Sequence, residues 1–139
     1  MNEQENTKVA GQMYETFMAG DVEAFLNLFS DDAVWRSPEI ENVPLNGKFT
    51  GRENLAGFIS GIDGYEEFLK FEPTEYIAQG DRVVVLGNFL ARSKTTDKQY
   101  ATDFAHIITV TDGKITNFYE FFDNAAAGRA HTAALEAAA

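Results

Sequence analysis

Residues 100–122 read YATDFAHIITVTDGKITNFYEFF, and this stretch decides the fold class of the chain. Asp112-Gly113, near its middle, is the strongest short signal for a hairpin, because these residue types tolerate the positive φ angles of a two-residue turn. Apolar and polar residues alternate over much of the stretch, which is the pattern of half-buried strands. We therefore expect a hairpin of two long strands, 100–111 and 114–122.

A second hairpin is predicted directly before the first. The apolar runs 68–78 and 82–92 flank Gly80-Asp81, whose leading glycine suits a two-residue turn. The second half of the chain is therefore predicted to be mostly strand.

The first half of the chain is predicted to be mainly helical, because apolar residues recur there at helical spacing behind capping residues. The expected elements are a helix over 8–18, a helix capped by Asp21 and carrying Val22 to Phe29, a strand over 33–37 ended by Pro38, a loop over 39–48, and a helix from the capping box Thr50–Glu53 to about Ile62. An Ala-rich helix capped by Asp123 or Asn124 ends the chain, and its low amphipathicity predicts loose attachment. Helices and hairpins in separate blocks indicate one α+β domain over residues 1–139.

The composition favours a thick aromatic core or a cavity walled with rings. The chain has 12 Phe, 5 Tyr and 1 Trp among 139 residues, and rings bury much area on few side chains. It has no Cys, which excludes disulfides, thiolate metal sites and a cysteine nucleophile, and its 2 His are too few for a histidine-rich metal centre.

The charge of the chain argues against two classes of partner. The formal net charge of −11 repels phosphate backbones and anionic lipid, so neither nucleic acid nor a membrane is an expected partner. No apolar stretch approaches the roughly 20 residues of a membrane span. The first residues, MNEQE, are polar and acidic, unlike a signal peptide, so we expect a cytoplasmic protein.

The last predicted hairpin brings candidate acid/base groups together. Strand alternation puts six residues on one face, namely Phe104, His106, Ile108, Phe118, Glu120 and Phe122. His106 and Glu120 are then expected as near neighbours among rings. Burial raises the pKa of a carboxyl and a nearby imidazolium lowers it, so such a pair can exchange a proton near neutral pH. A buried His and Glu that only satisfy each other in the core would give the same pattern.

Other polar side chains are predicted to join this pair. Tyr14, on the first helix, is a candidate donor to a developing oxyanion, although a half-buried Tyr with its hydroxyl in water fits the sequence equally. The predicted catalytic residues are His106, Glu120 and Tyr14, and the predicted ligand-binding residues are Trp35, Ser37, Phe58, Phe104, Phe118 and Phe122. The chain has no glycine-rich phosphate loop, nucleophile elbow, His-Glu-x-x-His motif or calcium loop, so we expect no cofactor and no metal.

Both faces of the last predicted strand are apolar. The face opposite Glu120 carries Ile115, Tyr119 and Phe121, which would form an exposed apolar patch in a monomer. We therefore expect a homodimer through the outer face of the sheet.

Three segments together resemble the SnoaL-like, ketosteroid-isomerase-like proteins: FSDDAVW at 29–35, FTGRENL at 49–55 and DGKITNFYEFFD at 112–123. The resemblance implies the cone-shaped fold shared with nuclear transport factor two, in which a strongly bent mixed sheet surrounds a deep pocket, usually in a dimer. This family contains steroid isomerases, polyketide cyclases and epoxide hydrolases beside proteins that only bind, so the fold alone does not choose a reaction.

The resemblance also implies roles for individual positions. The catalytic Asp of the steroid isomerases would precede Pro38, where this chain has Ser37, which cannot act as a carboxylate base. Their helical Tyr falls near Tyr14 and their second Asp on His106, and a cyclase-type or hydrolase-type carboxylate falls near Glu120. The familiar steroid isomerisation is therefore not expected here.

Three functions stay open on the sequence. The first is a cofactor-free acid/base enzyme acting on a small apolar molecule by isomerisation, cyclisation, dehydration or hydration, and the second is a non-catalytic carrier of a hydrophobic ligand. The third is an accessory or dimerisation module whose pocket is filled by Phe104, Phe118 and Phe122. An open cavity with His106 and Glu120 within hydrogen-bond reach would support the first two.

Overall fold

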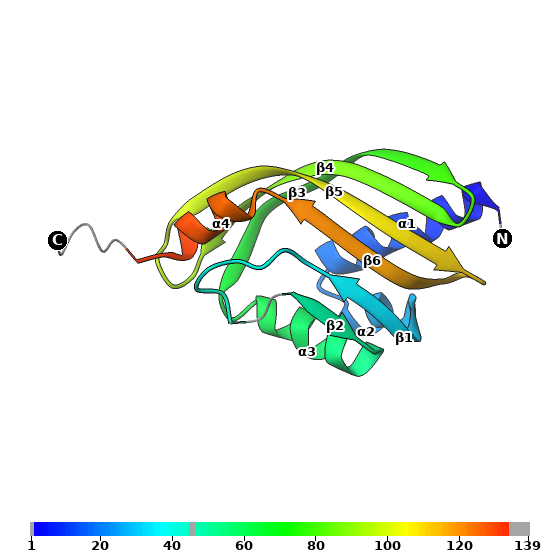
Figure 1. Cartoon of the computed structure of the whole chain (residues 1–139), viewed down its shortest axis with the longest axis horizontal. Coiled ribbons are helices and arrows are strands. Elements are labelled where there is room, and N and C mark those ends of the chain that lie inside the picture. Colours follow the sequence, from blue (N-terminus) through cyan, green and yellow to red (C-terminus); the bar gives the residue numbers. More distant parts are fainter. Residues whose placement is uncertain (1, 45–46, 134–139) are drawn as a thin grey trace.

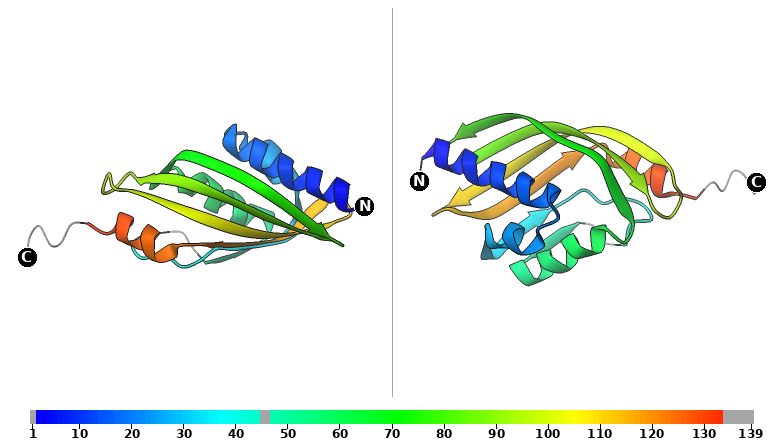
Figure 2. Two further views of the ribbon diagram at one scale, coloured as in Figure 1. Left: turned by 90° about the horizontal axis from the view of Figure 1, so that it is seen from above. Right: turned by 180° about the vertical axis from the view of Figure 1, so that it is seen from behind.

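A computed structural model describes residues 2–44 and 47–133. In this part of the chain the elements are α1 (Glu3–Met18), α2 (Val22–Asn27), β1 (Phe29–Arg36), β2 (Lys48–Thr50), α3 (Arg52–Ile62), β3 (Glu66–Gln79), β4 (Arg82–Ser93), β5 (Gln99–Thr111), β6 (Lys114–Phe122) and α4 (Asn124–His131). The strands form a single bent sheet, with α1, α2 and α3 against one face of it and α4 near one end (Figures 1 and 2).

The sheet has the strand order β2-β1-β6-β5-β4-β3. All neighbouring strands are antiparallel except β1 and β6, which are parallel and join the first half of the chain to the last hairpin. The predicted α+β fold with a strongly bent mixed sheet is confirmed. The sheet is curled rather than closed, so it is a cone with an open side and not a complete barrel.

Both predicted hairpins are confirmed, and their turns explain them. Asp112 and Gly113 have φ angles of 51° and 80°, the two positive values that a type I′ turn needs. Gly80 has a φ angle of 60° at the first position of the β3–β4 turn. These turns fix the register of β3 with β4 and of β5 with β6, and hence which residues face the helices.

A bulge in the last hairpin corrects one predicted face. The register between β5 and β6 shifts between Thr109 and Val110, so that Ile115 lies opposite Val110. A bulge adds one residue to one strand and thereby reverses the facing of the residues beyond it. Ile115 is therefore fully buried rather than part of the outer face, whereas Phe121, beyond the reach of the bulge, remains 43% exposed.

Helix boundaries in the first half differ from the prediction. Helix α1 begins at Glu3 rather than at residue 8, because the Asn2 side chain accepts a hydrogen bond from the Glu5 backbone N–H and caps the helix. Asp21 caps α2 as predicted, but this helix ends at Asn27, and Phe29 already belongs to β1.

The segment between α2 and α3 contains more strand than predicted. Strand β1 includes Asp31 and Asp32, which stay extended and exposed across an irregular stretch of its pairing with β6. Lys48–Thr50 is strand β2 and pairs with β1. Thr50 therefore ends a strand and does not start the predicted helix. The predicted capping box of α3 is therefore wrong. The N-cap is Gly51, with a φ angle of 91°, and no side chain caps the helix.

Helix α4 is better anchored than its composition predicts. The Asp123 side chain caps it by accepting from the Ala126 backbone N–H, 2.9 Å away. Half of the helix is buried, namely Ala127, Gly128, Ala130 and His131. The loose attachment predicted for the end of the chain is wrong as far as His131, and residues 134–139 lie outside the described residues.

None of the helices in the described part of the chain is long and apolar enough to cross a membrane. The homodimer and the cytoplasmic location remain predictions.

Candidate functional site

A cavity lies between the inner face of the sheet and helices α1 to α3. Its volume is about 60 Å³, measured as the space open to the centre of a water-sized sphere. Since one water needs about 10–15 Å³ by this measure, the cavity admits a small molecule without any movement of its wall. The wall is mainly aromatic and aliphatic, and it includes Phe118 and Phe122, which therefore line the cavity without filling it.

His106 and Glu120 meet in this wall as predicted. The two residues are direct partners across β5 and β6, and His106 Nε2 lies 3.1 Å from Glu120 Oε2. The two groups differ in access, because the His106 side chain is 2% exposed and that of Glu120 is 15% exposed. Both residues line the cavity, and Glu120 is the more accessible of the two.

Tyr14 is bonded to the far side of the imidazole. Its hydroxyl lies 2.6 Å from His106 Nδ1, and the two rings are stacked with an interplanar angle of 8°. Burial, followed by the nearby Tyr76 and Glu120, raises the pKa of Tyr14 well above its usual value of 10.0, so the phenol stays protonated and donates. This hydroxyl therefore has a protein partner, and direct donation to a ligand oxygen stays a prediction.

Trp35 and Ser37 approach the carboxylate from the other side. Trp35 Nε1 donates to Ser37 Oγ over 2.7 Å, and Ser37 Oγ donates to Glu120 Oε1 over 2.8 Å. The indole also stacks on Phe118, with ring centroids 3.7 Å apart, which fixes its orientation. The parallel pairing of β1 with β6 brings these residues to Glu120.

The hydrogen bonds of this network end on the Glu120 carboxylate from two sides, through Tyr14 and His106 on one side and through Trp35 and Ser37 on the other. If Tyr14 donates to Nδ1, the proton of the imidazole is on Nε2 and is donated to Glu120, which also accepts from Ser37. A carboxylate only accepts, so a neutral imidazole and an ionised Glu120 satisfy every bond. We call this set of five residues the Glu120 network: Tyr14, Trp35, Ser37, His106 and Glu120.

The remaining predicted ligand-binding residues divide into two groups. Phe58 lines the cavity from α3, and its ring centroid lies 5.8 Å from that of Trp35. Phe104 does not line the cavity: it lies behind His106, with ring centroids 4.2 Å apart and an interplanar angle of 19°. Phe104 therefore supports the imidazole from the β5 side and does not meet a ligand directly.

Sequence reasoning missed a second polar cluster, formed by Glu66, Tyr100 and His131. The Tyr100 hydroxyl donates to Glu66 Oε1, and His131 Nε2 lies 3.2 Å from the same oxygen. Glu66 and Tyr100 line the cavity. One signal was available, because Tyr100 has the same strand parity as His106 and so the same face of the sheet, but no local pattern relates Glu66 to His131.

A groove on the surface lies next to the cavity. It lies among the end of α1, α2, the end of α3 and the first part of β3, and its volume is about 760 Å³ by the same measure. Several residues line both spaces: Phe17, Phe25, Ile59, Ile62, Glu66, Phe68 and Phe71. The groove and the cavity are therefore adjacent, and Glu66 lies between them.

The described residues contain no group of three or more His, Asp or Glu side chains that could hold a metal ion.

The chain is similar to proteins that share this fold. The sequence model of one family, described as a SnoaL-like domain, matches residues 10–118. No match was found among curated proteins.

Solved structures add three comparisons. A nuclear transport factor two-like protein from Burkholderia xenovorans LB400 is 31% identical, with a TM-score of 0.86 over 95% of this chain and 99% of that one. TerC, co-crystallised with polyporic acid, is 28% identical, with a TM-score of 0.77 over 91% of this chain and 98% of that one. A putative polyketide cyclase from Pseudomonas putida KT2440 is 17% identical, with a TM-score of 0.72 over 90% and 96% of the two chains, and indicates the fold alone.

Proposed function

This chain belongs to the SnoaL-like family, and we propose that its cavity is the active site of a cofactor-free enzyme that moves a proton on a small apolar molecule. The observation that carries the proposal is the Glu120 carboxylate, which is accessible from an apolar cavity and held on both oxygens by Ser37 and His106. Fixed donors orient a base before the substrate arrives, which is the arrangement that proton transfer needs.

The proposed step is removal of a proton from a carbon next to a carbonyl group. The C–H bond breaks, its electron pair forms the C=C bond of an enolate, and the carbonyl oxygen takes the negative charge. Glu120, now a carboxylic acid, returns the proton at another carbon in an isomerisation. In a cyclisation the enolate carbon attacks a second carbonyl carbon, and the proton goes to the oxygen formed there.

Tyr14 and His106 act through Glu120 in this proposal. The His106 side chain is 2% exposed, so its role is to hold Glu120 with the Nε2 proton, and Tyr14 holds the imidazole in that tautomer. We therefore assign Glu120 as the catalytic base and Tyr14 and His106 as positioning residues. Ser37, which replaces the Asp expected of a steroid isomerase, is also a positioning residue for Glu120.

A ligand carrier is the second candidate. The Glu120 network satisfies its own hydrogen bonds, which is what a buried polar group in a binding protein also requires. The two candidates differ in one measurable property, because a carrier binds without accelerating proton transfer.

The test uses 5-nitrobenzisoxazole, a small aromatic molecule that needs only a base. Removal of the proton on C3 of its isoxazole ring lets the C–H electron pair form the third C–N bond of a nitrile, while the N–O bond breaks and gives a coloured phenolate. We expect saturable acceleration by the wild type, and a kcat about 100-fold lower in Glu120→Gln, in line with the usual contribution of a general base. Glu75→Gln, an exposed carboxylate on β3, is the matched control and should behave as the wild type.

Binding is measured in parallel through Trp35, the single tryptophan of the chain, which lies in the cavity wall. Quenching of its fluorescence reports occupancy of the cavity, and polyporic acid is a second molecule to test because TerC was co-crystallised with it. If 5-nitrobenzisoxazole quenches Trp35 but reacts no faster with the wild type than with Glu120→Gln, the protein is a carrier and the enzyme proposal is wrong.

A further inference from the structure

Glu66, Tyr100 and His131 form a second buried polar cluster, which we call the Glu66 cluster. Glu66 is 7% exposed and His131 is 3% exposed, and each comes from a different element, β3 and α4. Among the described residues, the hydrogen bonds to this carboxylate come from Tyr100 and His131, and both end on Oε1. Oε2 accepts neither of these two bonds.

The position of Glu66 gives that oxygen access to a ligand. Glu66 lines both the groove and the cavity, so a molecule held in the cavity lies within reach of it. A buried carboxylate costs free energy unless it is hydrogen-bonded, and a hydroxyl on the ligand would add a bond on the unused side.

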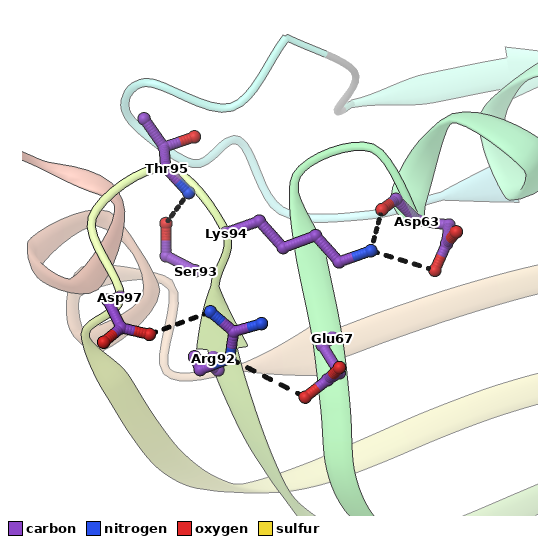
Figure 3. A network of polar contacts seen from close by, with 7 residues as sticks. All are labelled: Asp63, Glu67, Arg92, Ser93, Lys94, Thr95 and Asp97. Carbon is purple, nitrogen blue, oxygen red and sulfur yellow. Dashed lines mark hydrogen bonds and ion pairs between the residues drawn. The ribbon is translucent and has the colours of Figure 1, made fainter.

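Charged residues on the outside hold the backbone around Glu66 in place. Arg92 on β4 pairs with Glu67, and Lys94 donates to the Asp63 backbone carbonyl and lies 3.3 Å from its carboxylate (Figure 3). The Lys94 backbone N–H also donates to the Tyr65 carbonyl over 2.9 Å. These contacts join the end of α3 and the start of β3 to the end of β4. With the bonds from Tyr100 and His131, they position the Glu66 side chain before a ligand binds.

The two polar clusters lie at opposite ends of an aromatic wall. Tyr100 and His106 are six residues apart on the same face of β5, so at roughly 3.3 Å per residue their backbones are at most about 20 Å apart. The bend of the sheet shortens this separation, and after burial and Glu66 the charge of Glu120 is among the causes that raise the pKa of Tyr100. Between them Phe89 packs edge-to-face against both Tyr100 and Phe122, with ring centroids 5.7 and 5.6 Å apart. The cavity is thus polar at two ends and apolar in the middle.

We infer that Glu66 is a second ligand-binding centre, which accepts a hydrogen bond from a hydroxyl group at one end of an elongated, otherwise apolar substrate whose other end reacts at Glu120. This inference rests on the proposed function, because it takes the Glu120 end as the reacting end. It specifies the substrate class as an alcohol or phenol with an apolar body.

The test compares two ligands that differ in the proposed contact and by one methyl group. Trans-4-hydroxystilbene can donate to Glu66 and trans-4-methoxystilbene cannot, and neither carries a group for Glu120 to deprotonate at carbon. We expect the wild type to bind the hydroxyl compound about tenfold more tightly, the effect of one hydrogen bond to a charged acceptor. Glu66→Gln should reduce this ratio toward one, and Glu75→Gln should keep it.

Equal affinity of the wild type for the two stilbenes would overturn the inference, as would an unchanged ratio in Glu66→Gln. If Glu66→Gln does not fold, equal affinity of the wild type for the two ligands still overturns the inference, and Glu120→Gln shows whether a preference for the hydroxyl compound comes from Glu120 instead. The proposed function fails separately, through the absence of 5-nitrobenzisoxazole turnover, because that small molecule has no hydroxyl to offer to Glu66.

Discussion

The chain has two histidines, and each is buried with one glutamate and one tyrosine. The two sets differ in how their hydrogen bonds are arranged. In the Glu120 network the donors run in series, from Tyr14 through His106 to the carboxylate, and Ser37 occupies the other oxygen. In the Glu66 cluster Tyr100 and His131 donate in parallel to one oxygen. A series arrangement fixes both oxygens of a base, whereas a parallel arrangement leaves one oxygen for a ligand.

This difference teaches that the same three residue types can serve two tasks in one cavity. When hydrogen bonds run in series, removing one residue leaves the next residue without its donor. When two donors bind one oxygen in parallel, removing one donor leaves the other in place. The two clusters should therefore respond differently to equivalent substitutions.

The largest effect is expected from Gly87→Ala, which crowds both the ring that supports the Glu120 network and the backbone of β3. Gly87 lies opposite Phe104, the ring that stacks on His106, and an added Cβ would lie 2.4 Å from Phe104 Cζ and 2.3 Å from the Glu72 carbonyl oxygen. The backbone oxygen cannot move away cheaply, so we expect a loss of about 3 kcal/mol in the free energy of unfolding. Urea denaturation at pH 7 measures it.

Gly57→Ala is the matched control for this substitution. Gly57 is in α3 and a Cβ there would meet nothing within 4 Å, so the higher helix propensity of alanine should stabilise the protein by about 0.5–1 kcal/mol. Equal effects of the two substitutions would show that Phe104 does not depend on the space above Gly87.

The next largest effect is expected from removing the two phenol hydroxyls in turn. Tyr14→Phe leaves the buried His106 Nδ1 without its donor, and we expect a loss of about 2 kcal/mol in unfolding free energy. Tyr100→Phe leaves Glu66 with its bond from His131, so we expect a smaller loss, about 1 kcal/mol. Thermal and urea denaturation of the two variants measure this order.

Kinetics separate a positioning role of Tyr14 from a merely structural one. If Tyr14 holds the imidazole tautomer that supports Glu120, Tyr14→Phe should lower kcat for 5-nitrobenzisoxazole about tenfold and leave KM nearly constant. A larger stability loss in Tyr100→Phe than in Tyr14→Phe would contradict the distinction between the serial and the parallel hydrogen-bond arrangement. An unchanged kcat in Tyr14→Phe would contradict it as well.

Local patterns were enough to predict the Glu120 end of the cavity. Asp112-Gly113 fixes the last hairpin, and strand parity then places His106 opposite Glu120. The bond from Ser37 could not be predicted, because it depends on the parallel pairing of β1 with β6, which joins segments more than 80 residues apart. The sequence identified the residues there but not their connection.

The Glu66 cluster was beyond prediction for the same physical reason. His131 lies in an Ala-rich helix whose sequence has little amphipathicity, and its burial results from the packing of α4 against β4 and β5. Ile115 shows a second limit, because a single bulge moves it from the predicted outer face into the core. Both cases depend on tertiary contacts that no local window contains.

The smallest expected effect is in the pH dependence of stability, and both clusters should show it. Burial is the main cause that raises the pKa of Tyr14, and burial followed by the charge of Glu66 raises that of Tyr100. An acid whose pKa is higher in the folded state contributes stability that is complete below its unfolded pKa, near 10, and is lost as the pH rises above it. The wild type should therefore lose about 0.8 kcal/mol more than Tyr14→Phe between pH 8 and pH 10.5.

Urea denaturation at these two pH values measures the difference, and Tyr100→Phe should give a similar value because its phenol is also buried. Tyrosinate absorbance near 295 nm provides a check on the folded protein, in which neither phenol should ionise at pH 10.5. If the stability of the wild type and of both variants falls in parallel, the hydroxyls are reached by water in the folded state. Tyr14 and Tyr100 could then not be the water-excluded donors that the Glu120 network and the Glu66 cluster require.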